Sequence, residues 1–594
     1  MCLAFRLSQL GNGSIIRQWN SRIRQLVDQG NFRGALFQFC EMKRDGAEPN
    51  SWTFPFVSKA CAKIADLKTS QMVHTQMVKS RDHRDVFVQT PLVDMYIKCG
   101  RLDMARSVFL KMPYRDIASW NVMLKGFAQS GVVDGVFGTF RDMRFAGIVP
   151  DAVTVMGVCQ GVLCVKDPGL AKAVHCFGLC IGVDADVSVV NTLISVYAKC
   201  GELDSAESLF NGVATGSRTV VSWNSMIAGY AGLGKSSNAL ASYKLMLCEG
   251  LLPDLSTIIS MLSSYTQPES LSCGMLIHCH GIKSGCDSSI SVTNTLISMY
   301  SNCGEVDLAR CLFNSMPKRC RVSWTVMISG YAEKGDIGEA FHLFSAMEAS
   351  GEKPDSVTVI ALLSCCGQTG ALEAGKRVHA YANFQRFEED VIFCNALLDM
   401  YSKCGSMNDA RELFSAMPHK TIVSWTTMIK ACALNGLFPE ALNLFGQMVE
   451  VGLKPNHVTF VAILHACAHA GFLDQGMEYF DMMKEVYRIN PGLDHYSCIV
   501  DLLGRKGKLA EAVKFIHDMP IKPDAAIWGS LLWACKVHRD VEVGEYAADQ
   551  LFALEPNAAA PYVEMANLYA SAGQWRGVAS IRNTMKHKMV RKFP

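Results

Sequence analysis

The sequence contains few charged residues and has almost no net charge. Only 19% of the 594 residues are charged, 49% are hydrophobic, and the formal net charge at pH 7 is +2. A chain with so many apolar side chains must bury a face of nearly every segment, which excludes a mainly disordered protein. The small net charge predicts no long-range field that would attract nucleic acid. A nucleic-acid ligand would therefore be recognised through its bases rather than through many phosphates.

The sequence also lacks the spacings that mark metal sites and enzymes. No two of the 24 Cys are three residues apart and no H-x-E triplet occurs, although both would mark the zinc site of a nucleoside deaminase. We find no phosphate-binding loop and no nucleophile motif. We therefore expect no metal, no cofactor and no enzymatic activity. We interpret the Cys as reduced side chains that pack like small apolar residues.

The sequence predicts no membrane partner but does predict a targeted N-terminus. No run reaches the ~18 consecutive apolar residues that a membrane helix needs. The apolar-rich stretch from Ala152 to Val165 ends at Lys166. No acidic residue precedes Asp28, whereas four Arg do. This start is compatible with an organellar transit peptide over residues 1–15, and we favour the mitochondrion over the chloroplast.

Two aromatic marks recur with the same long period. Successive Trp residues lie 101, 103, 101 and 101 residues apart, and the Tyr residues that open Y-x-x-C-G lie 101, 103 and 101 apart. The marks are Trp19, Trp120, Trp223, Trp324 and Trp425, with Tyr96, Tyr197, Tyr300 and Tyr401. Two independent marks kept in phase over this length establish an internal repeat. Both lie on apolar stripes, so we interpret them as core side chains rather than as base-stacking platforms.

Each cycle divides into three helical hairpins of 35, 35 and 31 residues, which we call the Trp, middle and short hairpins. In the Trp hairpin that opens at Arg321, Trp324 and Ile328 fall on one face of a helix. Gly335 can end this helix and Asp336 can cap the next. Because neither helix can bury its apolar stripe alone, the hairpins must stack. The predicted fold is an all-α solenoid of helix-turn-helix hairpins.

The array is predicted to occupy residues 16–524, with further helical repeats over residues 525–594. No linker or low-complexity segment interrupts it. The 15 predicted hairpins open at Ile16, Ser51, Val86, Ile117, Ala152, Val187, Val220, Leu255, Ile290, Arg321, Ser356, Val391, Ile422, His457 and Leu493.

These repeats resemble those of plant pentatricopeptide repeat (PPR) proteins of the PLS subclass. The resemblance rests on the hairpin lengths and on the runs VVSWNSMIAGY at 220–230, GEKPD at 351–355 and MYSKCG at 400–405. It covers essentially the whole chain from Ile16 onwards. It implies a right-handed superhelical α-solenoid whose hairpins meet successive bases of single-stranded RNA.

The C-terminal runs resemble the final short repeat of that family at 493–512 and its E domain at 527–538 and 562–575. In the family, such proteins are organellar site-recognition factors for editing of cytidine to uridine. Many continue into a catalytic zinc deaminase domain called DYW, at the point where this chain reaches Pro594. The resemblance therefore implies either a factor that borrows a deaminase or a fragment that lacks its end. The implied partners are single-stranded organellar RNA, a DYW-type deaminase protein in trans and organellar editing cofactor proteins.

In the family the fifth and last residues of a hairpin read a base, and the second residue separates neighbouring bases. The Trp hairpins carry the pairs Asn20/Asn50, Asn121/Asp151, Asn224/Asp254, Thr325/Asp355 and Thr426/Asn456. In order, these imply a pyrimidine (cytidine favoured), uridine, uridine, guanosine and adenosine. The short hairpins carry Thr90/Asp116 and Ser497/Asp524, which imply guanosine, and Asn191/Thr219, Asn294/Cys320 and Asn395/Thr421, which imply a pyrimidine only loosely. The expected base separators are Val221, Val322 and Val423.

The middle hairpins carry fifth residues that cannot form hydrogen bonds, namely Pro55, Met156, Ile259, Ile360 and Val461. We expect these hairpins to act as spacers or docking surfaces. Asn, Thr and Asp near a helix start are also ordinary capping residues, which alone would account for any single pair. Two other functions stay open. One is a protein-binding scaffold like the tetratricopeptide repeats, which the near-neutral charge favours slightly, and the other is an RNA processing or stability factor without editing.

Overall fold

The computed structural model describes residues 2–80, 84–286, 288–385, 390–556 and 558–587, and the regular structure within them is entirely helical. These residues form 34 α-helices and the two 3₁₀ turns Thr215–Ser217 and Pro268–Ser270, without a strand. The prediction of an all-α solenoid is confirmed. Residues 588–594 of the predicted E domain lie outside the described residues.

Each hairpin begins with an odd-numbered helix. These first helices are α1 (Cys2–Asp28), α3 (Phe54–Ile64), α5 (Val86–Lys98), α7 (Ile117–Gln129), α9 (Ala152–Val165), α11 (Val187–Lys199), α13 (Val220–Gly232), α15 (Leu255–Ser263), α17 (Ile290–Asn302), α19 (Arg321–Lys334), α21 (Ser356–Thr369), α23 (Val391–Lys403), α25 (Ile422–Leu434), α27 (His457–Ala470), α29 (Leu493–Arg505), α31 (Ala525–His538) and α33 (Ala559–Ser571).

Each hairpin ends with an even-numbered helix. These second helices are α2 (Phe32–Arg44), α4 (Leu67–Lys79), α6 (Leu102–Lys111), α8 (Val133–Phe145), α10 (Pro168–Cys180), α12 (Leu203–Gly212), α14 (Ser236–Cys248), α16 (Leu271–Lys283), α18 (Val306–Ser315), α20 (Ile337–Ala349), α22 (Leu372–Gln385), α24 (Met407–Ala416), α26 (Phe438–Glu450), α28 (Leu473–Glu485), α30 (Leu509–His517), α32 (Val541–Leu554) and α34 (Trp575–His587).

Hydrophobic periodicity located the hairpins accurately. Every predicted opening from Val86 to Leu493 is the first residue of a helix. The helical region predicted after residue 524 forms two further hairpins, α31 with α32 and α33 with α34. The apolar stripe and the capping residues therefore carried enough information to place the start of nearly every first helix in the array.

Two predicted openings differ from the structure. Helix α1 begins at Cys2 and runs through Ile16 without a break. Helix α3 begins at Phe54 rather than at Ser51, after a turn. Pro55 lies in the first turn of α3, where the missing backbone N–H costs no helical hydrogen bond, so the helix begins just before it.

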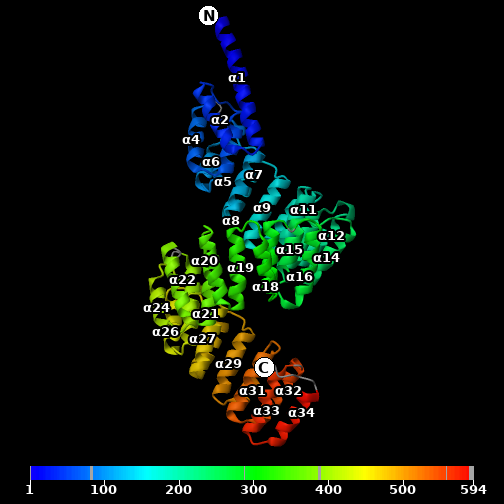
Figure 1. Cartoon of the computed structure of the whole chain (residues 1–594), viewed down its shortest axis with the longest axis vertical. Coiled ribbons are helices and arrows are strands. Elements are labelled where there is room, and N and C mark those ends of the chain that lie inside the picture. The colour runs from blue at the N-terminus through cyan, green and yellow to red at the C-terminus, as the bar shows by residue number, and fades with distance from the viewer. Residues whose placement is uncertain (1, 81–83, 287, 386–389, 557, 588–594) are drawn as a thin grey trace. The chain divides into compact units, whose positions relative to one another are not determined.

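The chain divides into two compact units, residues 1–299 and 300–594. Within each unit the first helices pack side by side in sequence order, from α3 on α5 to α13 on α15 in one unit and from α19 on α21 to α31 on α33 in the other. In Figure 1 the colour accordingly changes gradually from helix to helix within a unit. The first turns of consecutive first helices are therefore neighbours, which brings the fifth residue of one hairpin close to the start of the next.

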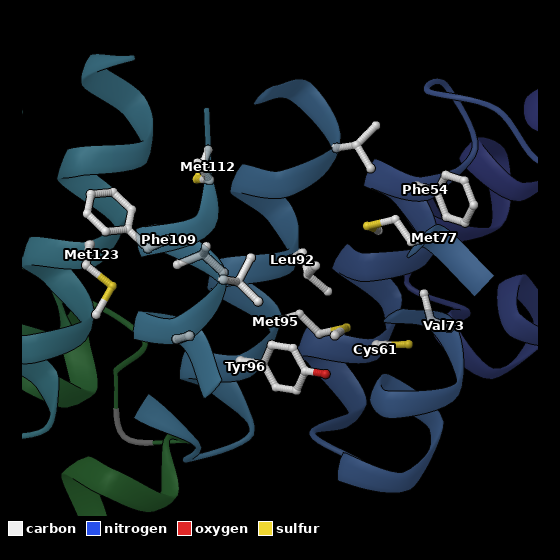
Figure 2. Close-up of a cluster of buried hydrophobic side chains, with 14 of the residues drawn as sticks. Phe54, Cys61, Val73, Met77, Leu92, Met95, Tyr96, Phe109, Met112 and Met123 are labelled. Carbon is white, nitrogen blue, oxygen red and sulfur yellow. The ribbon is translucent and has the colours of Figure 1, made fainter. Parts of the chain in front are cut away.

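The recurring aromatic side chains lie between the hairpins. The ring of each Trp from Trp120 to Trp425 meets a Phe of the preceding hairpin edge to face, with centroids 4.7–5.0 Å apart. Figure 2 shows part of this core, with Tyr96, Phe109 and Met77 among the buried side chains. The buried members of the predicted set are Trp120, Trp223, Trp324, Trp425, Tyr96, Tyr197, Tyr300 and Tyr401. The prediction that they are core residues is confirmed.

The turn between the two helices of a hairpin follows the predicted chemistry. Gly335 ends α19 in the left-handed conformation, with φ of 79°, which a residue without a Cβ adopts without strain. The carboxylate of Asp336 accepts a hydrogen bond from the backbone N–H of Glu339 and so caps α20.

The buried Cys side chains behave as small apolar groups. Burial raises the pKa of Cys61, Cys366 and Cys432 to about 12, so these thiols stay protonated at neutral pH. Among the described residues no group of three His, Cys, Asp or Glu is placed to hold a metal ion. None of the helices that the structure describes is both long and apolar enough to cross a membrane.

The close approach of neighbouring first helices can be tested at Gly229 of α13. A Cβ added there would lie 2.6 Å from the Cβ of Ala198 on α11, and neither methyl group can rotate away. We expect Gly229→Ala to lower the free energy of local unfolding by about 1–3 kcal/mol because the two helices must separate. Amide hydrogen exchange in α11 and α13 measures this effect.

Gly232, in the same helix, supplies the matched control. A Cβ added at Gly232 has no atom within 4 Å. Gly232→Ala should leave exchange unchanged or slow it, because Ala favours a helix over Gly by up to about 1 kcal/mol. Equal exchange in the two variants would contradict the close packing described here.

Candidate nucleic-acid interface

The fifth and last residues of the Trp hairpins meet in a hydrogen-bonded cluster. Asn224, in the first turns of α13, donates its Nδ2–H to Oδ1 of Asp254 at 2.9 Å. Asp254 is the N-cap of α15, the first helix of the next hairpin. Thr257, three residues later, donates its hydroxyl to Oδ1 of Asn224 at 2.7 Å and also contacts Oδ1 of Asp254 at 2.9 Å. One reader pair is thus assembled from two consecutive hairpins.

The same cluster occurs in the two preceding Trp hairpins. Asn121 donates to Asp151 at 3.0 Å and accepts the hydroxyl of Thr154 at 2.7 Å. In the first Trp hairpin, Asn20 donates to Asn50 at 3.1 Å and accepts the hydroxyl of Thr53 at 2.7 Å.

The two remaining Trp hairpins carry a modified cluster. The hydroxyl groups of Thr325 and Thr358 lie 2.7 Å apart, and Thr358 lies 2.9 Å from Oδ1 of Asp355. Thr426 contacts Thr459 at 2.8 Å, and Thr459 contacts Oδ1 of Asn456 at 3.0 Å. The shorter Thr side chain is therefore linked to the last residue through another hydroxyl.

The sequence analysis missed the Thr that completes each cluster. These residues are Thr53, Thr154, Thr257, Thr358 and Thr459, and they are buried. Their spacings of 101, 103, 101 and 101 residues are those of the Trp marks. This shared period could have identified the Thr residues from the sequence. Their hydrogen bonds to the fifth residues form only when neighbouring first helices pack side by side.

Two carboxylates of the Trp-hairpin clusters, Asp151 and Asp254, are held in the ionised form. Burial opposes ionisation of Asp151 and Asp254, but hydrogen bonds from the following Thr and from the fifth-position Asn outweigh it and lower both pKa values. An ionised carboxylate only accepts hydrogen bonds, whereas the amide of Asn50 or Asn456 can also donate. The last residues of the Trp hairpins therefore differ in whether they can donate a hydrogen bond.

The short hairpins place their reader residues differently. No hydrogen bond joins the residues of the pairs Thr90/Asp116, Asn191/Thr219, Asn395/Thr421 and Ser497/Asp524, all of which the structure describes. The buried atoms Thr90 Oγ1, Asn191 Oδ1 and Asn395 Oδ1 have no hydrogen-bond partner. An unpaired buried polar group costs about 1–3 kcal/mol. These fifth positions therefore carry unused hydrogen-bonding capacity.

The capping alternative holds for the last residue and not for the fifth. Asp116, Asp151, Thr219, Asp254, Asp355, Thr421, Asn456 and Asp524 are N-caps whose side chains accept a backbone N–H of the next helix. Cys320 occupies the same N-cap position, and Asn294 is buried within α17. The fifth residues already lie inside helices, so capping does not explain them. Last residues therefore combine a structural role with a position suited to recognition.

The predicted base separators are exposed apolar side chains. Val221, Val322 and Val423 are 58%, 53% and 56% exposed. Each of these side chains leaves more than half of its surface open to solvent, where a ligand can contact it. Six further exposed apolar residues occupy second positions that the sequence analysis did not assign, and they are Trp52, Phe87, Val153, Val357, Ile392 and Val458. All of these apolar side chains except Trp52, which precedes α3, lie in the first turns of first helices, and each lies three positions before the fifth residue of the same hairpin.

The middle hairpins interrupt the polar positions with apolar ones. Pro55, Met156, Ile259, Ile360 and Val461 are half-buried. None of these side chains offers a hydrogen bond to a base edge, which agrees with a spacer or docking role rather than a reading role.

Thr257→Val tests how the cluster is held together. The change removes the hydroxyl bonded to Asn224 and Asp254, and leaving such buried groups unsatisfied costs about 1–3 kcal/mol. We expect faster amide exchange in α13 and α15. Because this hydroxyl helps to lower the pKa of Asp254, the loss is full at neutral pH and shrinks as the pH falls through the folded pKa.

Thr75 provides the control for this substitution. Its hydroxyl bonds only the Gln71 carbonyl on the exposed side of α4. Thr75→Val should leave exchange in α13 and α15 unchanged. If Thr257→Val also leaves amide exchange in α13 and α15 unchanged, the cluster contributes nothing to stability.

Three kinds of comparison place this chain among known proteins. The PPR repeat family model matches residues 319–368 and 420–469, and the PPR repeat model matches nine segments between residues 19 and 522. The E motif model matches residues 538–594, within the region predicted as an E domain.

Relatives and solved structures agree with these matches. A mitochondrial pentatricopeptide repeat-containing protein of Arabidopsis thaliana is 53% identical over 99% of this chain and 90% of its own length. A chloroplastic one from the same plant is 36% identical over 94% of this chain and 69% of its own length. A crystal structure of the pentatricopeptide repeat protein PPR10 in complex with an 18-nucleotide psaJ RNA element has the same fold, with a TM-score of 0.53 and 18% identity over 97% of this chain and 85% of its own. The first relative supports the predicted mitochondrial localisation, and the chain belongs to the pentatricopeptide repeat family.

Proposed function

We propose that this chain is a sequence-specific single-stranded RNA-binding protein of the plant mitochondrion. The observation that carries the proposal is the polar cluster that recurs at every Trp hairpin with exposed apolar side chains at second positions. A helical-repeat reader needs such an arrangement, because it meets one base per repeat with two or three side chains. The RNA complex of PPR10, a protein of the same fold, supports this use of the surface.

The chemistry of the clusters favours particular bases. The ionised Asp254 can accept the N3–H of uracil but repels the lone pair on N3 of cytosine. The amide of Asn456 can donate to N1 of adenine, which a carboxylate cannot do. The Trp hairpins are thereby proposed to read cytidine or another pyrimidine, uridine, uridine, guanosine and adenosine, in chain order.

We further propose that the RNA contains a cytidine edited to uridine and that this chain selects the site without performing the chemistry. The E motif supports editing, and the missing zinc spacing in the sequence supports a deaminase of the DYW type acting in trans. Organellar editing cofactors would be additional protein partners. Deep sequencing of mitochondrial RNA from a plant without this gene should show the loss of one or a few cytidine edits.

The sequencing experiment also separates the alternatives. Intact editing with changed transcript ends or abundance would instead identify an RNA processing or stability factor. A purified chain that fails to shift random single-stranded RNA in a gel would favour the protein-binding scaffold. Deamination of cytidine by the purified chain alone, supplied with zinc, would overturn the proposal that catalysis comes from another protein.

Thr325→Asn tests the base assignment directly. Asn at this position can reach Asp355 as Asn224 reaches Asp254, so the preferred base should change from guanosine to uridine. We expect roughly 5- to 160-fold discrimination, the equivalent of about 1–3 kcal/mol for a good base contact. Selection from a random RNA pool with the wild-type and variant proteins reveals which position of the bound motif changes.

The control for base specificity is Thr75→Asn. The hydroxyl of Thr75 bonds a carbonyl of its own helix, as that of Thr325 does with Arg321, but Thr75 is on a second helix. Its replacement should leave the whole selected motif unchanged. A Thr325→Asn variant that folds and still selects guanosine would refute the assignment.

A further inference from the structure

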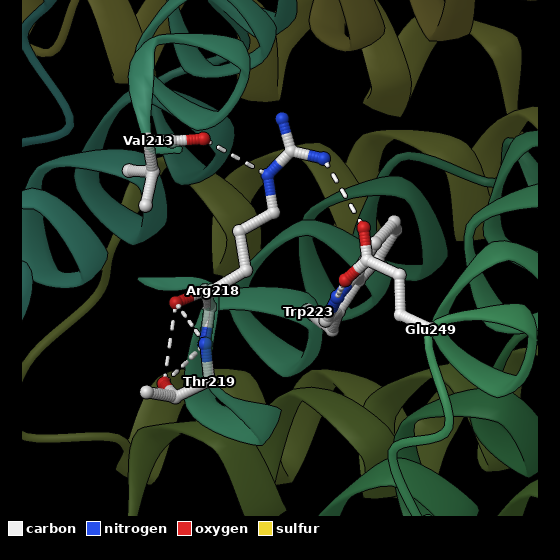
Figure 3. A network of polar contacts seen from close by, with 6 residues as sticks. Val213, Arg218, Thr219, Trp223 and Glu249 are labelled. Atoms are coloured by element: carbon white, nitrogen blue, oxygen red, sulfur yellow. Dashed lines mark hydrogen bonds and ion pairs between the residues drawn. The ribbon is translucent and has the colours of Figure 1, made fainter. Parts of the chain in front are cut away.

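A cation and two aromatic rings recur where a short hairpin meets the next Trp hairpin. Figure 3 shows the case at Arg218, whose Nε–H donates to the carbonyl of Val213 at 3.1 Å. The guanidinium carbon lies 4.6 Å from the ring centroid of Phe210 and 5.9 Å from that of Trp223. The loop cation is thus held against a buried Trp by the surrounding structure.

In this junction the carboxylate of Glu249 completes the group. The indole Nε1–H of Trp223 donates to Oε2 of Glu249 at 3.0 Å, and Nη1 of Arg218 lies 3.5 Å from Oε1. Glu249 is the C-cap residue directly after α14, 26 positions after Trp223. One carboxylate therefore satisfies a buried N–H donor and a cation together (Figure 3).

Two other junctions contain the donor and the cation without the carboxylate. Arg115 lies 5.1 Å from the ring of Phe109 and 5.9 Å from that of Trp120. Ala146, the C-cap residue after α8, occupies the position equivalent to Glu249. Its methyl group cannot accept the indole hydrogen bond.

The second such junction follows α24. Lys420 lies 5.2 Å from the ring of Phe414, and this Phe packs edge to face on Trp425 with centroids 5.0 Å apart. Val451 is the C-cap residue after α26, again 26 positions after the Trp. An apolar residue thus replaces the acceptor here as well.

The indole donors at these two junctions are unused. Trp120 and Trp425 are 5% and 6% exposed, and the Nε1 atom of each has no hydrogen-bond partner. Native proteins rarely leave such buried donors unpaired, because each costs about 1–3 kcal/mol. Trp120, Arg115 and Ala146 line one cleft of about 580 Å³. Trp425, Lys420 and Val451 line the other, of about 640 Å³.

We propose that each of these two clefts binds an Asp or Glu side chain of a partner protein, in the place that Glu249 fills within the chain itself. The contact of Glu249 with Trp223 and Arg218 indicates that the ligand is a carboxylate. The two clefts offer the same kinds of partner, an indole N–H and a Lys or Arg cation. The cleft rims are apolar and exposed at Leu110, Val132 and Val451, which suits a polypeptide with an apolar residue beside its acidic one.

The acidic groups already in the clefts do not take this role. In the cleft of Trp425, both carboxylate oxygens of Glu440 accept hydrogen bonds from Arg411, at 2.8 and 2.6 Å. Lys420 donates one hydrogen bond, to the carbonyl of Met417 at 2.9 Å, and its charge faces no carboxylate that lines this cleft. In the cleft of Trp120, Asp142 lies 3.7 Å from Arg141. Asp134, Arg106 and Arg115 also line this cleft, so its cations outnumber its carboxylates.

The indole N–H resonances of the full-length, ¹⁵N-Trp-labelled protein test the proposal. The probe is the blocked peptide acetyl-Leu-Glu-amide, with acetyl-Leu-Gln-amide as control, and assignments come from Trp120→Phe and Trp425→Phe. Only the Glu peptide should shift the Trp120 and Trp425 resonances downfield and saturably, at millimolar concentration, while Trp223 does not respond. The proposal is wrong if the Trp120 and Trp425 resonances show no saturable shift, or if the Gln peptide shifts them as much as the Glu peptide does.

Two exchanged variants sharpen the test. Val451→Glu should supply the carboxylate from within, move the Trp425 resonance toward that of Trp223 and abolish its response to the peptide, with Trp120 unaffected. Glu249→Val should remove the carboxylate that Trp223 contacts, so that the Trp223 resonance shifts when the Glu peptide is added. Unchanged resonances in both variants would refute the role of this position. None of these outcomes depends on RNA binding, so the inference stands or fails apart from the proposed function.

Discussion

The side-by-side packing of consecutive first helices is the constraint on which the other features depend. A helical hairpin with one apolar stripe cannot bury it alone, so each first helix packs on the next. Where the contact is close, as between Gly229 and Ala198, there is no room for another methyl group. In the Trp hairpins of Asn121 and Asn224, this packing brings the fifth residue within hydrogen-bond distance of the Asp that caps the next first helix.

Stability and recognition consequently share the same side chains. Asp254 caps α15 and, with Asn224, forms a proposed base-reading pair. Its low pKa follows from the hydrogen bonds that hold it, so the property that would select a base is a consequence of the fold. A capping residue restricted to Asp, Asn, Thr or Ser also restricts which base preferences the array can evolve without loss of helix stability.

At a few positions the fold buries a polar side-chain atom without giving it a hydrogen-bond partner. Asn191 and Asn395 leave amide oxygens unbonded at predicted reading positions, and Trp120 and Trp425 leave indole N–H groups unbonded at hairpin junctions. In the equivalent junction Trp223 is satisfied by Glu249. The three junctions differ mainly in one side chain, which is Glu249 in one and Ala146 or Val451 in the others. Comparing them therefore shows what each indole N–H gains or lacks when that single residue changes.

The sequence by itself determined the helical hairpins, their order and nearly all their openings, because apolar spacing, Gly at turns and capping residues are local signals. It also identified Trp324 and Tyr401 as core residues from their place on apolar stripes. It misplaced the start of α3, since Pro55 fits the first turn of a helix rather than its interior. Only the tertiary structure showed that Thr257 completes the Asn224 and Asp254 cluster and that Ala146 and Val451 leave indole donors unpaired. Those contacts join residues 26 to 33 positions apart, and whether they form depends on how neighbouring hairpins pack.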